Sequence, residues 1–482
     1  MRYLIAIFLC CSSLGAGAVP IGQEGARHLL ERTGFGAPPE LVVEYAHLER
    51  AAAVDRLLNG VSSPSQSAPP EPVYERPGRL KDLSGEERRP VQQEVARQGM
   101  SLRAWWAGEM LNAPTAQDAL RERMTLFWHN HFVSSQQKVK SVALMQRQNA
   151  LLRRYALGNF ASLLYAVSKD PAMVIYLDGA TNRKHSPNEN FAREVMELFT
   201  LGEGHYSEQD IKEAARAFTG WSFAPESGEF LWRPAMHDAG EKQVLGRRGN
   251  FDGDAVLDIL LAQSATADFL AGKLWREFVS PTPVPGEQRR IAAALRGAAY
   301  EIRPALRVLL LSDSFWAPAN RGSLIKSPAD FVIGTLRTLN VDVPDALPLA
   351  LALRNLGQDL FAPPNVRGWP GGESWINSTT LLARKQFVER LLRASEMNSR
   401  SMLRQEMRET GAGKLGQEGR TRALAAMAQI QFDAGQWLAR YPDSAAVNTA
   451  LLAISPVQPV PQGAHGLGLL RELLLDPVYQ LK

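Results

Sequence analysis

The chain has 482 residues, with 54 lysines and arginines against 50 aspartates and glutamates, and its formal net charge is +4. Basic and acidic residues alternate, as at residues 86–89 and 121–123, which is typical of solvated helix surfaces. Because a nucleic-acid-binding surface needs clustered basic residues, we expect no nucleic-acid partner.

Residues 1–18 have the order of a cleavable secretory signal peptide: a positive charge, an apolar run and small residues before the cleavage site. Arg2 supplies the charge, residues 3–11 are the apolar run, and Ala18 is the last residue before the expected cleavage. The run is shorter than the ~20 residues that a membrane-spanning helix requires. We therefore expect an exported protein, periplasmic or extracellular, with no transmembrane segment after cleavage.

Both cysteines of the chain, Cys10 and Cys11, lie in the segment that cleavage would remove. The mature chain is then expected to have no disulfide, no cysteine-ligated metal and no cysteine nucleophile. A chain of this length can bury enough apolar surface to fold without cross-links. Its chemistry is expected to use imidazole, carboxylate, hydroxyl or aromatic groups.

The remaining sequence predicts a mainly α protein, a multi-helix globular domain with two loop-rich insertions and at most a small β-hairpin. Residues 19–60 are expected to be an N-terminal helical segment. Residues 61–75 are rich in serine and proline and predict a linker or exposed loop. A main helical domain is expected over residues 76–395, followed by a C-terminal helical segment, residues 396–482, that packs on it.

Apolar residues recur with helical spacing through most of the chain. Helices are expected at residues 26–30, 41–58, 91–110, 116–132, 142–157, 160–168, 188–201, 208–219, 255–278, 287–299, 304–312, 378–408, 421–441 and 466–475. The helix at residues 208–219 is the best delimited, because Ser207 and Asp210 form a capping-box pattern at its start and Gly220 follows its end.

Two stretches interrupt the helical pattern. Residues 218–253 are rich in aromatic residues and glycine, and a small β-hairpin is expected around residues 226–233. Residues 357–377 contain a proline-rich run and a glycine-rich run around Trp369. These are the two loop-rich insertions.

Some short matches to known sequence motifs lack the neighbouring elements that the corresponding sites require. Residues 411–416 satisfy a dinucleotide-binding glycine pattern, but they follow a charged helical stretch instead of a strand. Residues 323–326 and 135–138 both match Ser-x-x-Lys, but no Lys-Thr-Gly partner occurs in the chain. We therefore expect neither a nucleotide cofactor nor a penicillin-recognising site.

The sharpest candidate site is the aromatic run at residues 127–132, which contains two histidines. On a helix, His131 shares a face with the apolar side chains of the run, whereas His129 lies at the margin of that face. His131 is interpreted either as a core histidine bonded to a neighbour or as a metal ligand or acid/base group.

A second candidate is the helix expected at residues 188–201. Asn190, Glu194 and Glu197 are spaced by four and seven residues along the edge of its apolar face. Glu194 and Glu197 could bind a divalent cation or share a proton. The alternative is that Arg193 pairs with a neighbouring glutamate and that the row is a solvated face.

A third candidate is the adjacent pair His237 and Asp238 in the first loop-rich insertion, since loops often carry binding sites. The alternative is a solvated loop pair. The candidate metal ligands are His129, His131, Glu194, Glu197, His237 and Asp238. Without thiols, such a set implies a divalent metal ion such as zinc, manganese or calcium as cofactor.

These blocks resemble the bacterial family catalogued as domain of unknown function 1800. The resemblance rests on residues 128–132, 188–202, Tyr206, 214–221, His237, Asp238, Lys242, Gly246, 273–275, 326–328, 357–358 and 363–372. It covers nearly the whole mature chain. It implies a mainly helical exported protein without an established reaction, encoded beside a secreted protein similar to sulfatases, so a sulfatase-like protein is the implied partner.

Two functions are compatible with this sequence, and whether the protein is an enzyme stays open. As a non-enzymatic partner or maturation factor for another secreted protein, it would use aromatic loop residues as interface anchors. The expected anchors are Trp221, Trp232, Arg367, Trp369 and Trp375. The alternative is a metal-assisted hydrolase in which His131, Glu194 and Glu197 are catalytic and a bound water is activated in a cleft.

Overall fold

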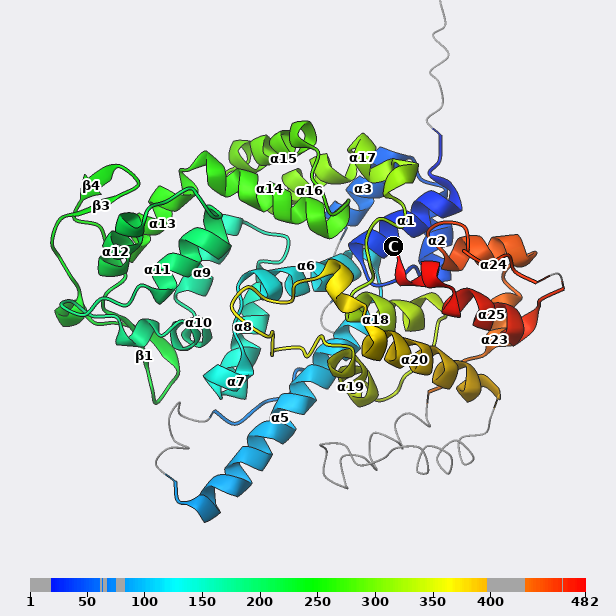
Figure 1. The fold of residues 1–482 in the computed structure, drawn as a ribbon, viewed down its shortest axis with the longest axis horizontal. Helices are drawn as coiled ribbons and strands as arrows, with labels where there is room; N and C mark the ends of the chain where they lie inside the picture. Colours follow the sequence, from blue (N-terminus) through cyan, green and yellow to red (C-terminus); the bar gives the residue numbers. More distant parts are fainter. Residues whose placement is uncertain (1–18, 61–62, 64–66, 75–82, 397–429, 462) are drawn as a thin grey trace, which may run out of the picture.

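The computed structural model describes residues 19–60, 63, 67–74, 83–396, 430–461 and 463–482. This described part of the chain is mainly α, as predicted, and contains two short pairs of strands (Figure 1). The expected signal peptide, part of the expected linker, the end of the helix expected at 378–408 and the glycine pattern at 411–416 lie outside the described residues.

The helices of the first half cover the N-terminal segment and the motif blocks as far as the strands. They are α1 (Gly22–Thr33), α2 (Pro39–Ala46), α3 (Arg50–Asn59), α5 (Gly85–Leu111), α6 (Ala116–His131), α7 (Gln136–Val139), α8 (Val142–Arg154), α9 (Phe160–Ser168), α10 (Pro171–Tyr176), η1 (Gly179–Thr181), α11 (Asn190–Glu194), the π-helix η2 (Val195–Thr200) and α12 (Glu208–Ala217).

The second half is also helical and returns the chain to the N-terminal helices. Its helices are η3 (Pro234–Met236), α13 (Gly253–Leu261), α14 (Ser264–Phe278), α15 (Pro285–Gly297), α16 (Ile302–Leu310), α17 (Asp313–Trp316), η4 (Pro318–Asn320), α18 (Pro328–Thr338), α19 (Leu347–Asn355), η5 (Gly372–Trp375), α20 (Ser378–Glu396), α23 (Ala434–Leu438), α24 (Ser444–Leu451), α25 (Gly466–Leu475) and η6 (Pro477–Gln480).

The capping signals around α12 act as predicted. The Ser207 hydroxyl accepts a hydrogen bond from the Asp210 amide, and the Asp210 carboxylate accepts one from the Ser207 amide, so both members of the capping box are formed. Gly220 follows the helix with φ +87°, a conformation that favours glycine. Local sequence therefore sets both ends of this helix.

The prediction of a single helix at residues 255–278 is wrong. The chain forms two helices there, α13 and α14, whose axes are bent by 71° relative to each other. Gln263 adopts an extended conformation between them. Its side-chain amide donates to the Ile259 carbonyl, and the Thr266 hydroxyl donates to the Leu260 carbonyl. These side chains satisfy carbonyls at the end of α13 that a continuous helix would have used.

The strands lie in the first loop-rich insertion. β1 (Trp221–Ala224) pairs antiparallel with β2 (Glu229–Trp232), which confirms a hairpin around residues 226–233. A second antiparallel pair, β3 (Lys242–Val244) and β4 (Arg247–Gly249), was not expected. Its strands have three residues each, too short for an alternating pattern to be recognised.

Two groups of buried side chains form the core. One joins α1 and α3 to α6, α8, α9 and α11–α16, and the other joins α5 to α18, α19, α20, α23, α24 and α25. The N-terminal helices α1 and α2 also lie against the C-terminal helices, as Figure 1 shows for α1, α2 and α24. In the described part of the chain, no single helix has the length and hydropathy of a membrane span; the bent pair α13–α14 reaches them only together.

Candidate functional site

The largest cleft that we describe, about 820 Å³, lies between α6, α14, the start of α18 and the loop at residues 357–377. Its polar lining comprises Arg123, Asn130, His131, Lys273, Arg276, Glu277, Ser323, Ser327, Asp330, Gln358, Arg367, Glu373, Ser374 and Lys482. Segments that are more than 200 residues apart in the sequence therefore form its wall. We call it the motif cleft, because five of the blocks quoted for the family resemblance, residues 128–132, 273–275, 326–328, 357–358 and 363–372, contribute lining residues.

Asn130 holds the glycine-rich loop against α6. Its side-chain oxygen accepts a hydrogen bond of 2.7 Å from the Trp369 amide, and its side-chain nitrogen donates to the Trp369 carbonyl at 3.4 Å. Gly368 has φ +82°, and a Cβ at this position would lie 2.2 Å from the Asn130 oxygen. The position of the Asn130 side chain therefore leaves room only for glycine at residue 368. The two residues together fix one wall of the cleft.

His131 and Lys273 form the floor of the cleft, next to the π-helix η2. The last carbonyls of a helix have no partner inside it, and here they find partners on α6 and α14. His131 Nε2 lies 3.1 Å from the Phe199 carbonyl oxygen, and Lys273 Nζ donates to the Leu198 carbonyl at 3.3 Å. The Lys273 ammonium also donates to His131 Nδ1 at 3.0 Å.

These contacts fix the protonation of the imidazole. A carbonyl only accepts and an ammonium only donates, so Nε2 carries the proton of neutral His131 and Nδ1 is the acceptor. Burial, and then the charge of Lys273, lower the pKa of His131 well below its usual range. His131 is therefore a neutral histidine that supports the lysine.

Lys273 is the least compensated charge of the cleft. Burial and the neighbouring Arg276 lower its pKa to about 8, and its ammonium group lies 5.0 Å from the centroid of the Phe269 ring. Within the described residues, neither Lys273 nor Arg276 pairs with a carboxylate. They are three residues apart on α14, so the cleft has an anion-seeking side.

The buried charges of the cleft, unlike the partly buried Lys273, are satisfied. Asp330 accepts from Arg123 and, at 2.7 Å, from the Lys482 ammonium, and these cations hold the pKa of the carboxyl far below its usual range although burial opposes them. Glu277 pairs with Arg123 at 3.3 Å. These groups fix the walls and leave no strong charge for a ligand.

Glu194 and Glu197 lie behind the rim of the cleft. Glu197 accepts from the Tyr206 hydroxyl at 2.9 Å and from Arg367 at 2.7 Å, and Arg367 also pairs with Glu203. Glu194 is half-buried, and burial followed by the charge of Glu197 raises its pKa. Arg367, which lines the cleft, thus connects it to the predicted carboxylate pair.

The whole chain from residue 28 to residue 480 matches one family model, described as "Protein of unknown function (DUF1800)". The chain belongs to the DUF1800 family. No curated protein and no solved structure gives a significant match. The family resemblance stated from the motif blocks is confirmed, and it leaves the reaction open.

His129 of this DUF1800 protein lies away from the cleft surface, buried among Trp106, Phe361 and Trp369. Burial lowers its pKa to about 3, and its Nε2 has no hydrogen-bond partner among the described residues. The two histidines of the run therefore have different surroundings, as expected from their spacing of two, but both are buried.

His237 and Asp238 lie beyond β2, in the first loop-rich insertion. His237 Nδ1 is 3.0 Å from the Thr219 carbonyl oxygen, and its ring packs on Trp232 at 4.9 Å. Asp238 accepts two hydrogen bonds from Arg216, which lower its pKa to about 2. Each residue is engaged by this insertion, and neither lines the motif cleft.

The six candidate metal ligands of this DUF1800 protein are therefore distributed over four places. Only His131 lines the motif cleft, and Glu194 and Glu197 form a pair behind its rim. His129 is buried among aromatic rings, and His237 and Asp238 are held within the first loop-rich insertion. Over the described ranges, no group of three or more His, Cys, Asp or Glu side chains is placed to hold a metal ion. A metal role for these residues stays a prediction.

The five candidate interface anchors also differ in exposure. Trp221, Trp369 and Trp375 are buried, with 5–7% of their surface exposed, whereas Trp232 is 38% exposed. The Arg367 side chain is exposed and lines the cleft. Two of the five anchors, Trp232 and Arg367, therefore reach the surface, and the other three support the loops from inside.

The residues that sequence reasoning missed are Asn130, Lys273 and Arg276. Each lies in or beside a motif block. The candidate site residues were chosen among histidines and acidic residues, so an asparagine, a lysine and an arginine were not included. The signal for Lys273 was its position on α14 between Leu270 and Leu274, which are fully buried. A lysine next to a buried stripe needs an acceptor, and the acidic residue four positions later on the same helix, Glu277, pairs with Arg123 instead.

Proposed function

We propose that this DUF1800 protein is an exported, non-catalytic binding partner of another secreted protein, and that the motif cleft holds an acidic side chain or terminus of that partner. The secreted sulfatase-like protein implied by the family resemblance is the candidate partner. Lys273 carries the proposal, because it is a cation in a cleft with no carboxylate to neutralise it among the described residues.

The energetics favour an anionic ligand. Placing a cation in a poorly solvated position is costly unless a counter-charge or several hydrogen bonds compensate it. Lys273 has only a neutral imidazole and one carbonyl as acceptors, and Arg276 adds a second positive charge beside it. A carboxylate that enters the cleft would accept charge-assisted hydrogen bonds, which are stronger than neutral ones.

The shape of the cleft fits recognition of a protruding segment. Glu373 also lines the cleft and carries no ion pair among the described residues, so its charge would repel an incoming anion, whereas Lys273 and Arg276 would attract it. Electrostatic complementarity of this kind sets specificity and association rate more than raw affinity. Arg367, already paired with Glu197 and Glu203, would form the rim.

The test measures binding of the purified sulfatase-like neighbour to the chain from residue 19 onward by biolayer interferometry. Loss of a charge-assisted contact costs about 10- to 100-fold in affinity, so Lys273→Met and Arg276→Gln should each weaken binding by that amount. Arg289→Gln is the matched control, because Arg289 is an exposed arginine on α15 outside the cleft.

A hexapeptide of glutamates should compete with the neighbour, and its glutamine counterpart should not. Binding that is equally strong in Lys273→Met and Arg276→Gln would refute the cleft as the interface. No binding of the neighbour, together with binding of the glutamate peptide, would refute this partner and retain the anionic ligand.

A further inference from the structure

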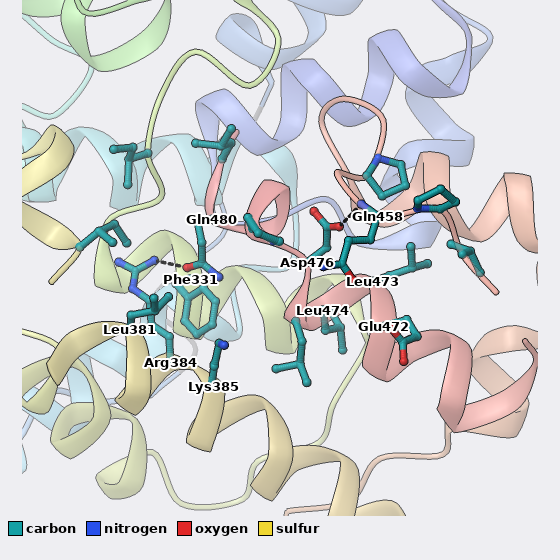
Figure 2. A pocket seen from close by; sticks show the side chains of 18 residues that line it. Phe331, Leu381, Arg384, Lys385, Gln458, Glu472, Leu473, Leu474, Asp476 and Gln480 are labelled. Carbon is teal, nitrogen blue, oxygen red and sulfur yellow. Dashed lines mark hydrogen bonds between the residues drawn. The ribbon is translucent and has the colours of Figure 1, made fainter. Parts of the chain in front are cut away.

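A second pocket, of about 510 Å³, lies between the start of α20 and α25 (Figure 2). Its wall is mostly apolar and comprises Ile325, Phe331, Ile376, Leu381, Leu473, Leu474, Leu475, Leu481, Val460 and three prolines. Ile325 also lines the motif cleft, so one short stretch of chain separates the two cavities. Nothing in the proposed partner function uses this pocket.

Arg384, on α20, is a fully buried cation in this apolar wall. It donates to the Gln480 side-chain oxygen at 3.0 Å and to the Lys326 carbonyl at 2.8 Å, and it lies on the Phe331 ring at 4.8 Å. Its Nε is buried without a hydrogen-bond partner among the described residues. Two of its five N–H donors are therefore used.

Comparison with another buried arginine shows that this arrangement is incomplete. Arg32 is equally buried, but it donates four hydrogen bonds. The acceptors are the backbone carbonyls of Phe278, Val279 and Asn320 and the hydroxyl of Ser323. Arg384 has half that number and no carboxylate partner in the described part of the chain. A buried guanidinium with spare donors beside an empty apolar space calls for an anion.

Lys385, the next residue of α20, extends the basic end of the pocket to the surface. It lines the same pocket, and its side chain is exposed and forms no ion pair within the described ranges. Figure 2 shows Arg384 and Lys385 on the α20 side of the space and Leu474 of α25 facing them. The pocket thus has a cationic side and an apolar interior.

The acidic residues of the pocket lie on its other side and do not neutralise Arg384. The Asp476 carboxylate accepts hydrogen bonds from the backbone amides of Val457, Gln458 and Val478, so its oxygens are already engaged by the main chain. Glu472 is exposed on α25. The charge pattern therefore orients a ligand, with its anionic group toward α20.

We propose that this pocket binds an unbranched aliphatic carboxylate of the fatty-acid class, with its carboxylate on Arg384 and Lys385 and its chain among the leucines of α20 and α25. The volume lies within the range of small-molecule sites, about 300–1,000 Å³. Arginine suits the head group because its planar guanidinium can donate two parallel hydrogen bonds to a carboxylate.

The first test is calorimetric titration of the chain from residue 19 onward with octanoate, decanoate, dodecanoate and dodecanol. Each added methylene should strengthen binding about 2- to 4-fold until the pocket is full. Dodecanoate should bind about 10- to 100-fold more tightly than dodecanol, because only the acid forms the charge-assisted contacts. Equal affinity of the acid and the alcohol would overturn the proposal.

Variants locate the site. Leu381→Trp fills the pocket and should abolish dodecanoate binding, whereas Leu382→Trp should leave it unchanged, because Leu382 is the adjacent residue and is 57% exposed outside the pocket. Arg384→Met should remove the preference for the acid over the alcohol. Lys385→Gln, at an exposed position, should reduce that preference several-fold without affecting folding. Unchanged binding in Leu381→Trp would place the ligand elsewhere and refute this site.

Discussion

The contact between Asn130 and the glycine-rich loop gives a prediction about stability whose size follows from the structure. Gly368→Ala places a methyl group 2.2 Å from the Asn130 side-chain oxygen and 2.8 Å from the Asn130 carbonyl oxygen. Real Cβ atoms do not approach so closely, so the asparagine must leave its position. Its two hydrogen bonds to Trp369 would then be lost.

The expected cost has two parts. A non-glycine residue in the left-handed conformation that Gly368 adopts costs about 1–2 kcal/mol, and each hydrogen bond lost contributes about 0.5–1.5 kcal/mol. Gly368→Ala should therefore lower the free energy of unfolding by about 2–5 kcal/mol. Gly372→Ala is the matched control, because Gly372 lies in the same loop with φ +56° and a Cβ there would meet nothing within 4 Å.

Urea-induced unfolding of the three proteins, followed by circular dichroism, measures both parts. Gly372→Ala should cost only the conformational part, about 1–2 kcal/mol, and the difference between the variants reports the clash with Asn130. If the two variants unfold at the same urea concentration, Asn130 does not hold the loop, and our account of this wall of the cleft is wrong. Asn130→Ala should reproduce the hydrogen-bond part alone.

Two further predictions concern buried acids outside the anion-seeking side of the cleft. Burial raises the pKa of Asp170 to about 7, so the folded protein binds this proton more tightly than the unfolded chain, whose aspartates titrate near 3.9. The difference in the free energy of unfolding between the native protein and Asp170→Asn should therefore change with pH. The native protein should lose a few kcal/mol relative to the variant as the pH rises from about 4 to 7, and the difference should stay constant above pH 7. A difference that does not depend on pH would contradict this prediction. Asp330→Asn leaves Lys482 buried without a carboxylate and Arg123 with Glu277 alone, so it should destabilise the protein by about 3–5 kcal/mol. Asp313→Asn, at a side chain that is 98% exposed, should change the stability little. Equal effects of the two substitutions would refute the buried cluster.

Local signals predicted the fold where side chains alternate between core and solvent. α9 and α25 begin and end at the expected residues, 160–168 and 466–475. α18 was not expected at all, although Ser327 and Asp330 form a capping box at its start and Pro328 lies in its first turn. Every residue of Pro328–Thr338 is buried, including the charged Asp330 and Arg337, because residues distant in the sequence supply their partners.

The candidate site was less predictable because its geometry departs from a regular helix. The row of Asn190, Glu194 and Glu197 was predicted from the period of an α-helix, but α11 ends at Glu194 and a π-helix follows. In the π-helix, hydrogen bonds run from i to i+5 and the turn is wider. The two glutamates still lie close enough for their charges to interact, but the row is not a straight edge.

The sequence left two interpretations of His131 open, a core histidine or a functional group, and the π-helix bears on both. Its final carbonyls, Leu198 and Phe199, need donors from outside the helix, and Lys273 and His131 supply them. A histidine alone would satisfy one carbonyl and remain a core residue. The lysine, brought from 142 positions away to the imidazole, adds a charge that the carbonyls do not neutralise.

That surplus charge is why we assign the ligand site to Lys273 and a positioning role to His131. If His131 only filled the core, His131→Phe would preserve the packing with the surrounding aromatic rings and leave ligand binding unchanged. If it positions the lysine, the same variant should retain the fold but weaken binding of the glutamate hexapeptide toward the level of Lys273→Met. Because the imidazole is neutral, its loss removes no charge, and any effect on binding must act through the position and proton affinity of the Lys273 amine.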